Sequence, residues 1–491
     1  MISLHLIGQL SVHSASDFQQ TASFDMHLSF HGADRNVTGS CHLIQCAGKK
    51  ILIDCGLFQG GRALSEENAE DFGFHPWEID FVLLTHAHLD HCGRLPLLVK
   101  RGFKGEIITT SASKDLARLV LLDSAHLQES EARNREKRSR RQRHEHEAPA
   151  PALYTLYDAT RCFDFFGRVA EYQQSIPLAE GITTCFYDAG HILGSASIAL
   201  ELEEGDHRRR IVFSGDLGSD GRVILRDAEP PPPADFVVME TTYGDRLHRS
   251  LGASIEELYG AINACFARNG NVIIPSFALE RAQELLWYLR EGVESGALPA
   301  GMHVFLDSPM AISATEIYRH HPECYDEQSA DLFAHQRDPF TLANLHIVRD
   351  MNDSMAINQI KGGAVIMAGS GMCTGGRVQH HLKHHLWDRN SSVVFVGFAS
   401  KGTLARQIID GQRSVRILGE EVAVNAQIHT INGFSAHADR DELLAWHHHI
   451  QAPHTFLVHG EDEVMQHFAG LLQNTKIHLP QQGECFDLLA L

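Results

Sequence analysis

The chain has 491 residues, of which 43% are hydrophobic and 21% charged, and its formal net charge is −20. This length exceeds one ordinary hydrophobic core and predicts two domains, while the composition is that of a soluble globular protein. The negative charge disfavours a generic nucleic-acid coat protein, because a uniformly acidic surface repels a polyanion. It does not exclude a nuclease whose cleft is locally positive.

Membrane and secreted proteins are also disfavoured. No apolar run is long enough to span a bilayer, and the first ten residues lack the basic start and apolar core of a secretory signal. The ten cysteines are scattered without a C-x-x-C pair, which fits free thiols better than a disulfide framework. We therefore expect a cytoplasmic protein without membrane contact.

The first half of the chain is predicted to be rich in strands. Residues 1–25 lack periodicity and are expected to be an N-terminal extension of no structural role, with Met26 as an alternative start. Helices are expected at Leu95–Leu98 and Asp115–Gln128, and another apolar-periodic stretch covers Ala159–Val169. Short apolar or alternating runs predict strands at Met26–Phe30, His42–Gln45, Lys50–Asp54, Phe81–Thr85, Ile198–Leu202, Arg210–Ser214 and Phe236–Glu240.

From Asp245 the pattern changes to alternating helices and strands. Such alternation favours a parallel sheet with helices on both faces, and so a second domain. The tail Phe434–Leu491, with a strand at Thr455–Val458, is expected to return to the first domain. The helices are predicted at Ser254–Arg268, Leu279–Arg290, Ala311–Tyr318, Val378–Leu386 and Leu404–Ile409. The strands are predicted at Asn271–Pro275, His303–Asp307, Ala364–Met367 and Val393–Gly397.

One strongly basic segment, Arg133–Arg143, continues the helical pattern of the residues before it and ends ahead of a break at Pro149. Two interpretations stay open for this segment. The first is a solvated helix end, and the second is an arm that attracts phosphate groups.

The segment Thr85–His91 is the most informative about chemistry, and it follows a short apolar strand. In extended backbone, His86 and His88 point to the same side because strand side chains repeat every two residues. Asp90 and His91 follow where the chain turns toward a helix. Imidazole and carboxylate ligands without cysteine suit zinc, so the cluster predicts a site for two zinc ions side by side.

Four short motifs each place one more ionisable residue at a strand end or on a glycine turn: Asp54, His191, Asp216 and His459. Each motif is weak alone, because such a residue is more often a turn or cap residue. Together with the cluster they supply enough ligands for two metal ions. A pair of metals is the arrangement used for phosphoryl displacement, and it supplies hydroxide near neutral pH.

Histidine alone carries little information here, because the chain contains 33 of them. Residues His380, His381, His384 and His385 have the i,i+4 spacing of a helix face, and His447–His449 form a run. A solvated helix face is the preferred interpretation for both groups.

The H-x-H-x-D-H motif of residues 86–91 resembles the hallmark of the metallo-β-lactamase superfamily. Three more segments resemble its β-CASP branch of nucleases, which includes ribonuclease J and the nuclease subunit of the pre-mRNA cleavage and polyadenylation factor. These segments are Met239–Gly244, Gly433–Asp439 and Leu457–Gly460.

This resemblance implies an α/β fold with two parts. A metallo-β-lactamase αββα sandwich would comprise residues 26–244 and 433–491, and a parallel-sheet α/β β-CASP domain would be inserted over residues 245–432. The implied activity is zinc-dependent hydrolysis of RNA phosphodiester bonds, with a metal-bridging hydroxide as nucleophile. His459 favours RNA over DNA, because DNA-cutting relatives usually lack a histidine at this position.

The resemblance also implies two sets of zinc ligands that share Asp216 as a bridge. The first zinc would bind His86, His88 and His191. The second would bind Asp90, His91 and His459.

Three other residues would act beside the ions. Asp54 would orient ligands from outside the coordination sphere. His437 would be the general acid that protonates the leaving oxygen, held and kept basic by Glu240. The alternatives are a buried structural histidine for His437 and a strand-end surface carboxylate for Glu240.

Substrate contacts are expected on loops of the inserted domain. The turn containing Ser370, Gly371 and Met372 follows a strand and precedes a helix, so its backbone N–H groups would cradle a phosphate. An ordinary tight turn is the alternative. Further contacts are predicted for Ser276, Lys401 and Arg406.

Two other functions compete with an RNA hydrolase as interpretations of the sequence. One is a hydrolase of a small thioester or lactam, which the long insert and the His437 and Glu240 motifs oppose. The other is a non-catalytic partner subunit, which is disfavoured because no ligand is missing. The sequence leaves open endonuclease or 5′-exonuclease mode, the physiological RNA, and the oligomeric state, with a homodimer as one alternative.

Overall fold

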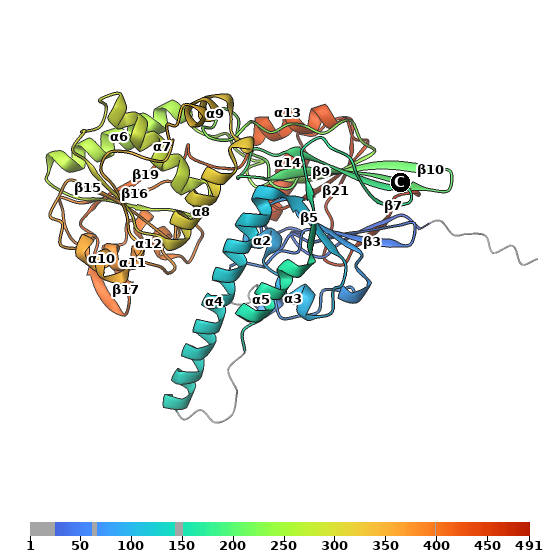
Figure 1. The fold of residues 1–491 in the computed structure, drawn as a ribbon, viewed down its shortest axis with the longest axis horizontal. Helices are drawn as coiled ribbons and strands as arrows, with labels where there is room; N and C mark the ends of the chain where they lie inside the picture. The colour runs from blue at the N-terminus through green and yellow to red at the C-terminus, as the bar shows by residue number, and fades with distance from the viewer. Residues whose placement is uncertain (1–24, 61–65, 143–150, 398) are drawn as a thin grey trace, which may run out of the picture.

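The computed structural model describes residues 25–60, 66–142, 151–397 and 399–491, with the side chains of 138–142 left out. The molecule has two parts, a sandwich of two seven-stranded sheets and a domain built on a six-stranded sheet. Figure 1 shows the sandwich on the right and the inserted domain on the left. The predicted extension 1–25 lies, except for its last residue, outside the described residues.

The first sheet of the sandwich combines parallel and antiparallel strands. Its last four strands in spatial order pair in parallel, and the other pairs are antiparallel. The order is β22 (Cys485–Asp487), β1 (His27–Phe30), β2 (His42–Cys46), β3 (Lys49–Ile53), β4 (Phe81–Leu83), β5 (Glu106–Thr110) and β6 (Phe166–Ala170).

The second sheet of the sandwich is also mixed. Its first four strands in spatial order pair in parallel, and the remaining pairs are antiparallel. The order is β21 (Lys476–His478), β20 (His454–Val458), β11 (Phe236–Glu240), β10 (His207–Phe213), β9 (Ala196–Glu204), β8 (Ile182–Asp188) and β7 (Ile176–Ala179).

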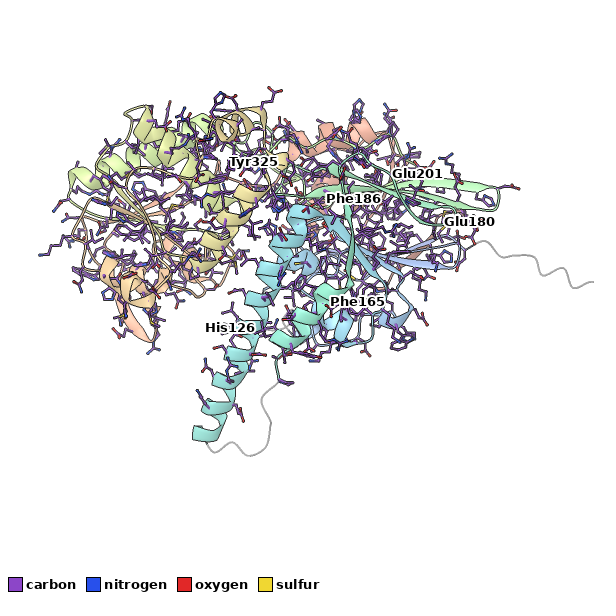
Figure 2. All side chains as sticks on the ribbon, in the orientation of Figure 1. His126, Phe165, Glu180, Phe186, Glu201 and Tyr325 are labelled. Carbon is purple, nitrogen blue, oxygen red and sulfur yellow. The ribbon has the colours of Figure 1, made fainter. Side chains whose placement is uncertain are left out.

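Apolar side chains from the inner faces of both sheets form the core of the sandwich. Phe186 of β8 is fully buried there with residues of β1, β10 and β20. Figure 2 shows it inside the sandwich, while Glu180 lies at the far end of the molecule. Helices cover the outer faces, which gives the predicted α/β/β/α order. The covering helices are α3 (Leu95–Lys100), the first half of α4 (Ser111–Gln142), α5 (Leu156–Cys162), α13 (Arg440–Ile450) and α14 (Asp462–Ala469).

The inserted domain has the predicted parallel sheet, and all strand pairs within this six-stranded sheet are parallel. The order is β14 (Leu345–Ile347), β13 (His303–Leu306), β15 (Ala364–Ala368), β12 (Val272–Pro275), β16 (Ser392–Phe395) and β19 (Gln427–Thr430). Helices pack on both faces, as expected for such a sheet.

The helices on one face of this sheet are α6 (Leu251–Ala267), α7 (Arg281–Glu294) and α8 (Pro309–His320). Those on the other face are α11 (Val378–His385) and α12 (Leu404–Ile409), which pack with the hairpin β17 (Ser414–Ile417) and β18 (Glu420–Ala423). Two short helices complete the domain, α9 (Glu327–Ala334) and α10 (Met351–Ile357). These elements all lie within the predicted range 245–432.

One predicted segment differs from the structure. The stretch Ala159–Val169 is not one element, because α5 ends at Cys162 and β6 begins at Phe166. The helix predicted at Asp115–Gln128 continues through the basic segment to Gln142, as its helical pattern indicates, and in Figure 1 the far half of α4 stands clear of both domains.

The basic segment lies at the end of α4, with Arg143 outside the described residues. Two of its arginines form i,i+4 ion pairs, Arg133 with Glu129 at 3.4 Å and Arg135 with Glu131 at 3.7 Å. These contacts belong to a solvated helix face. The phosphate-attracting arm stays a prediction.

The ten cysteines are free, and most of them are buried. Within the described residues, no helix is both long and apolar enough to cross a membrane.

Candidate metal centre

The predicted ligands lie on loops that leave neighbouring strands at one edge of the sandwich. β4 leads through the His86–His88 segment into the one-turn helix α2 (Leu89–Cys92). β10, β11 and β20 pair in parallel, and β8 runs in the same direction because it is two antiparallel steps from β10. The loops after these strands therefore meet, and they bring His91 within contact of His459, 368 positions away.

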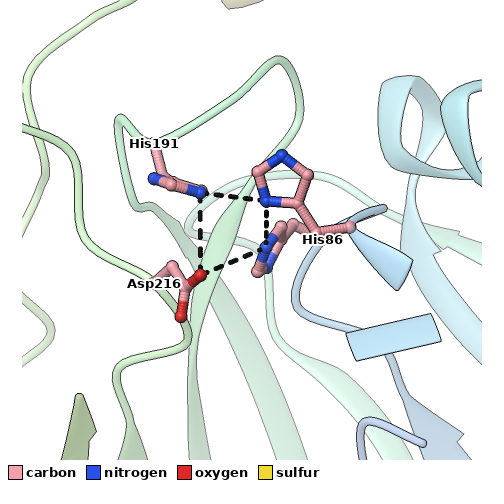
Figure 3. A group of neighbouring side chains, drawn as sticks. His86, His191 and Asp216 are labelled. Carbon is pink, nitrogen blue, oxygen red and sulfur yellow. Dashed lines mark hydrogen bonds and ion pairs between the residues drawn. The ribbon is translucent and has the colours of Figure 1, made fainter. Parts of the chain in front are cut away.

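Three histidines and one aspartate form the first cluster of ligand atoms. His88 Nδ1 lies 3.1 Å from both His86 Nε2 and His191 Nε2. Asp216 Oδ2 lies 3.5 Å from His86 Nε2 and 3.6 Å from His191 Nε2, as Figure 3 shows. A tetrahedral zinc ion with bonds of about 2.0–2.1 Å separates its ligand atoms by about 3.3–3.4 Å. The cluster therefore has the dimensions of a tetrahedral zinc site.

A second cluster lies beside the first and contains Asp90, His91 and His459. His91 Nε2 lies 3.3 Å from His459 Nε2, and Asp90 Oδ2 lies 3.5 Å from His459 Nε2. The other carboxylate oxygen of Asp216, Oδ1, lies 3.3 Å from His91 Nε2. Asp216 thus turns one oxygen toward each cluster, which is the geometry of a bridging ligand.

The donor atoms of both clusters fit a cation better than they fit one another. His88 Nδ1 faces two imidazole nitrogens, and one proton cannot satisfy both contacts. Asp216 Oδ1 is buried without a hydrogen-bond partner among the described residues. A buried carboxylate oxygen in that condition is costly unless a cation or a water binds it.

The protonation states in the first cluster also suit metal binding. Burial lowers the pKa of His86 and of His191 well below the usual value for histidine. Burial likewise lowers the pKa of His88 to about 4. Imidazoles with such pKa values are neutral at pH 7, so each offers a lone pair to a metal ion.

Several ligands are held in place by hydrogen bonds from their far side. Asp54, which is buried, accepts a hydrogen bond at 2.7 Å from His91 Nδ1, and this leaves Nε2 facing the second cluster. His191 Nδ1 donates to the carbonyl oxygen of Ala436 at 3.1 Å. A carboxylate or carbonyl behind a ligating histidine fixes its tautomer and ring orientation.

His437 and Glu240 lie beside the first cluster. His437 Nδ1 is 3.2 Å from Glu240 Oε2, and Glu240 Oε1 accepts a hydrogen bond from the N–H of Leu217. Burial lowers the pKa of His437, but the negative charges of Glu240 and Asp216 outweigh it and raise this pKa to about 9. The imidazole is therefore protonated at neutral pH, while 22% of its side chain stays exposed. This combination suits a proton donor.

The predicted substrate residues gather at the carboxyl ends of β12 and β15. Ser276 is buried, and its hydroxyl donates to the carbonyl of Phe277 at 2.9 Å. Ser370 accepts from the N–H of Thr374 at 3.1 Å. Among the described residues, the N–H groups of Gly371 and Met372 have no hydrogen-bond partner. These two N–H groups are available to an anion.

The two predicted cations lie near the start of α12. The N–H of Ala405 donates to the carbonyl of Met372 at 3.2 Å, so this helix begins against the Gly371 loop. Lys401 is exposed just before it. Arg406 forms an ion pair with Asp410, the residue that follows the last residue of α12. Its guanidinium is therefore already engaged, and its role in substrate binding stays a prediction.

Several residues that support the ligand loops were not singled out from the sequence. Thr85 donates to Asp54 through both its N–H and its hydroxyl. Ser195 accepts from the N–H of His191 at 3.0 Å. Thr85 could have been found from its place in the histidine motif, whereas nothing in the sequence links Ser195 to a role.

Two buried contacts connect these loops to the inserted domain. Tyr318 of α8 accepts from the N–H of Leu193 at 3.4 Å and donates to Glu280 at 2.5 Å. Arg222, from the loop after Asp216, forms a buried ion pair with Glu284 of α7. The inserted domain therefore helps to hold the loops that carry His191 and Asp216.

Three family models match the chain. The Metallo-beta-lactamase superfamily model matches residues 35–165, and the Beta-Casp domain model matches residues 282–408. A model described as Zn-dependent metallo-hydrolase RNA specificity domain matches residues 421–480. These matches confirm the resemblance predicted from the motifs.

The chain is also similar to several individual proteins. Ribonuclease TTHA0252 of Thermus thermophilus is 38% identical over 462 residues, covering 94% of this chain and 99% of that protein. Transcription termination factor FttA of Methanococcus maripaludis is 32% identical, covering 89% of this chain and 67% of that protein. Cleavage and polyadenylation specificity factor subunit 3-I of Arabidopsis thaliana is 29% identical, covering 93% and 63%.

One solved structure has the same fold at low sequence identity. A protein of unknown function from Enterococcus faecalis aligns with a TM-score of 0.54 and 12% identity, covering 94% of this chain and all of that one. This likeness concerns the fold alone.

Proposed function

The chain belongs to the β-CASP family of RNA-acting metallo-hydrolases, and we propose that it hydrolyses RNA phosphodiester bonds with two zinc ions held side by side. One observation carries the proposal. Seven ionisable side chains from four separate segments converge, and neighbouring ligand atoms lie 3.1–3.6 Å apart. They are His86, His88, Asp90, His91, His191, Asp216 and His459.

Each ion would have its own ligand set in this proposal. His86, His88 and His191 would hold the first ion, and Asp90, His91 and His459 the second, with Asp216 between them. Zinc suits both sets because all of the donors are imidazole nitrogens or carboxylate oxygens. When bound, the two ions lower the pKa of a water molecule and offset the charge that develops on the phosphate.

The remaining proton transfer belongs to the protein. His437, protonated at neutral pH, would give its proton to the oxygen of the leaving nucleotide. Glu240 would keep the ring oriented through its contact with Nδ1, so that Nε2 is the nitrogen that donates. Glu240 also accepts from the N–H of Leu217, which ties the acid to the loop of Asp216.

The inserted domain would bind the RNA backbone. The N–H groups of Gly371 and Met372 would donate to a phosphate, and Lys401 would add a positive charge nearby. Ser276 lies at the neighbouring strand end. The relatives named as a ribonuclease and as a polyadenylation specificity factor subunit support RNA as the substrate.

A cleavage assay with metal analysis tests this function. Purified protein is expected to contain two zinc ions and to cut end-labelled single-stranded RNA, and a chelator should abolish cutting. Processive release of mononucleotides would indicate an exonuclease, and discrete internal products would indicate an endonuclease. Hydrolysis of a lactam or thioester in preference to RNA would reject the proposal, as would a zinc-loaded protein that cuts no RNA.

A further inference from the structure

Phe277 is an exposed aromatic ring in the loop between β12 and α7. Phe277 is 43% exposed, and it is the only exposed phenylalanine in the part of the chain that the structure describes. The loop lies at the carboxyl edge of the parallel sheet, where ligands of such sheets usually bind. An exposed aromatic ring at this edge of the sheet is therefore a stronger candidate for a ligand contact than an exposed ring elsewhere on the surface.

The ring lies on the backbone of two neighbouring loops. A Cβ atom added to Gly371 would come within 2.7 Å of the ring, and one added to Gly397 would come within 3.9 Å of it. A side chain at position 371 would therefore displace the ring. The glycine backbone supports one side of Phe277 and leaves another side open to solvent.

The surroundings of the ring supply donors for an anionic, planar ligand. Phe277, Gly371, Gly397 and Arg281 line one shallow pocket with residues of β12 and β16. Arg281 is largely buried and forms an ion pair with Glu284. Among the described residues, no hydrogen-bond partner is present for its Nε and Nη2 groups. The N–H of Gly371 is also without a partner in that part of the chain.

Tyr243 connects this pocket with the metal centre. Its ring centre lies 6.1 Å from that of His437. Burial raises the pKa of Tyr243, and the nearby positive charge of Arg281 opposes that rise. Arg281 therefore acts electrostatically on a residue that contacts the proposed acid, and it also lines the pocket of Phe277.

We propose that Phe277 is a stacking platform for one nucleobase of the RNA, with Arg281 binding a phosphate of the same strand. This inference rests on the proposed function and adds a base-binding subsite to it. A ring held on glycine backbone is rigid and accepts the face of any base, so it selects single-stranded RNA without selecting sequence. One ring is too small an apolar surface for a protein interface, which needs hundreds of square ångströms.

Substitution of the ring tests the platform. Phe277→Leu keeps an apolar side chain but removes the π face, and it should raise the KM for a ten-nucleotide RNA about 10-fold with little change in kcat. Phe277→Trp should restore the KM. Trp387→Leu is the matched control, because Trp387 is another exposed aromatic of the inserted domain and does not line the pocket. It should leave KM unchanged.

An abasic scan identifies the contact itself. RNAs that lack one base, at each position in turn, are compared for binding by fluorescence anisotropy with a chelator present, since Phe277 and Arg281 are not metal ligands. The wild-type protein should lose about 10-fold in affinity at one position, and Phe277→Leu should show no further loss there. The same abasic profile in both proteins, or an unchanged KM in Phe277→Leu, would overturn the platform.

The two proposals fail in different ways. Zinc-loaded wild-type protein that cuts no RNA would reject the proposed function, whereas the binding scan would still report on Phe277. Normal RNA cleavage together with an unaltered abasic profile would reject the platform and leave the hydrolase intact.

Discussion

The metal centre and helix α11 are both rich in histidine, yet His381 of α11 is used in the opposite way from the histidines of the metal centre. In the metal centre, His88 Nδ1 lies 3.1 Å from nitrogens of both His86 and His191. In α11, both nitrogens of His381 are engaged, Nε2 with Asp307 at 2.6 Å and Nδ1 with Asn358 at 2.9 Å. A histidine is a candidate metal ligand when a ring nitrogen without a hydrogen-bond donor or acceptor of its own lies close to other such nitrogens. The spacing of histidines in the sequence does not by itself show which rings are placed in this way.

The buried aspartates of the two regions differ in the same way. Asp307 accepts hydrogen bonds from Ser354 and His381 and pairs with Arg377, so both of its oxygens are satisfied. Asp216 is equally buried, but its Oδ1 has no hydrogen-bond partner among the described residues. We infer that Asp307 stabilises the inserted domain and that Asp216 serves a cation.

Substitution of these two aspartates should separate the roles most strongly. Asp216→Asn removes the shared charge, so bound zinc should fall below one ion per chain and RNA cleavage should drop by about 10⁴-fold or more. Asp307→Asn is the matched control, because it removes an equally buried charge outside the site, and it should retain two ions. Zinc is measured by elemental analysis of gel-filtered protein. Two ions in Asp216→Asn would contradict the bridging role.

We expect His437→Ala to keep both zinc ions and to lose turnover, because in the proposed mechanism the ring donates a proton and is not a zinc ligand. We expect kcat on RNA to fall about 10²–10⁴-fold. A phosphodiester with a p-nitrophenyl leaving group needs no proton and should be affected far less. Since an acid acts only when protonated, the wild-type rate should fall as pH rises through the pKa of His437, and the variant should lack this alkaline decline. Equal losses on both substrates would argue against the acid role.

Asp54→Asn should weaken one of the two sites. Asp54 holds His91 through Nδ1, and loss of such a partner typically lowers metal affinity about 10–100-fold. Because His91 belongs to the second cluster alone, chelator titration should remove one ion early and the other as in the wild type. Ser40→Ala is a suitable control, because its contact with Asp54 is long, at 3.4 Å. Simultaneous loss of both ions would contradict this division.

Much of the fold could be predicted because local patterns matched the final packing. The alternation of helices and strands after Asp245 predicts the parallel sheet. The resemblance of the histidine and aspartate motifs to the metallo-β-lactamase superfamily predicts the sandwich. β8 was not predicted, because its inward positions include Thr184 while Cys185 and Tyr187 point outward. Hydropathy therefore does not alternate along it. Short edge strands such as β21 and β22 are defined by pairing with neighbours more than by their own residues.

The candidate site was predictable only where a motif was local. The spacing within residues 86–91 carries chemical information by itself, whereas the ion pair of Arg222 with Glu284 joins two domains. Phe277 was not singled out, because an apolar residue after a buried strand resembles a core residue. Its exposure depends on where the Gly371 loop lies, which is a property of the folded sheet.

Substitution of Asp307, which is hydrogen-bonded to Ser354 and His381 and paired with Arg377, should have the smallest of these effects. The pH dependence of the free energy of unfolding tests it. Asp307→Asn should lower the free energy of unfolding of the zinc-free protein by about 1–3 kcal/mol at pH 7, because it leaves buried partners unsatisfied. Burial raises the pKa of Asp307, but hydrogen bonds from His381, Ser354 and Arg377 outweigh it and lower this pKa below the usual 3.8. A lowered carboxyl pKa stabilises the fold above the unfolded pKa, and this stabilisation is lost as pH falls through the folded value. Urea unfolding should therefore show a gap between wild type and variant that is constant from pH 7 to about 5 and narrows below about 4. A gap that widens in acid would show that the carboxylate does not act through its charge.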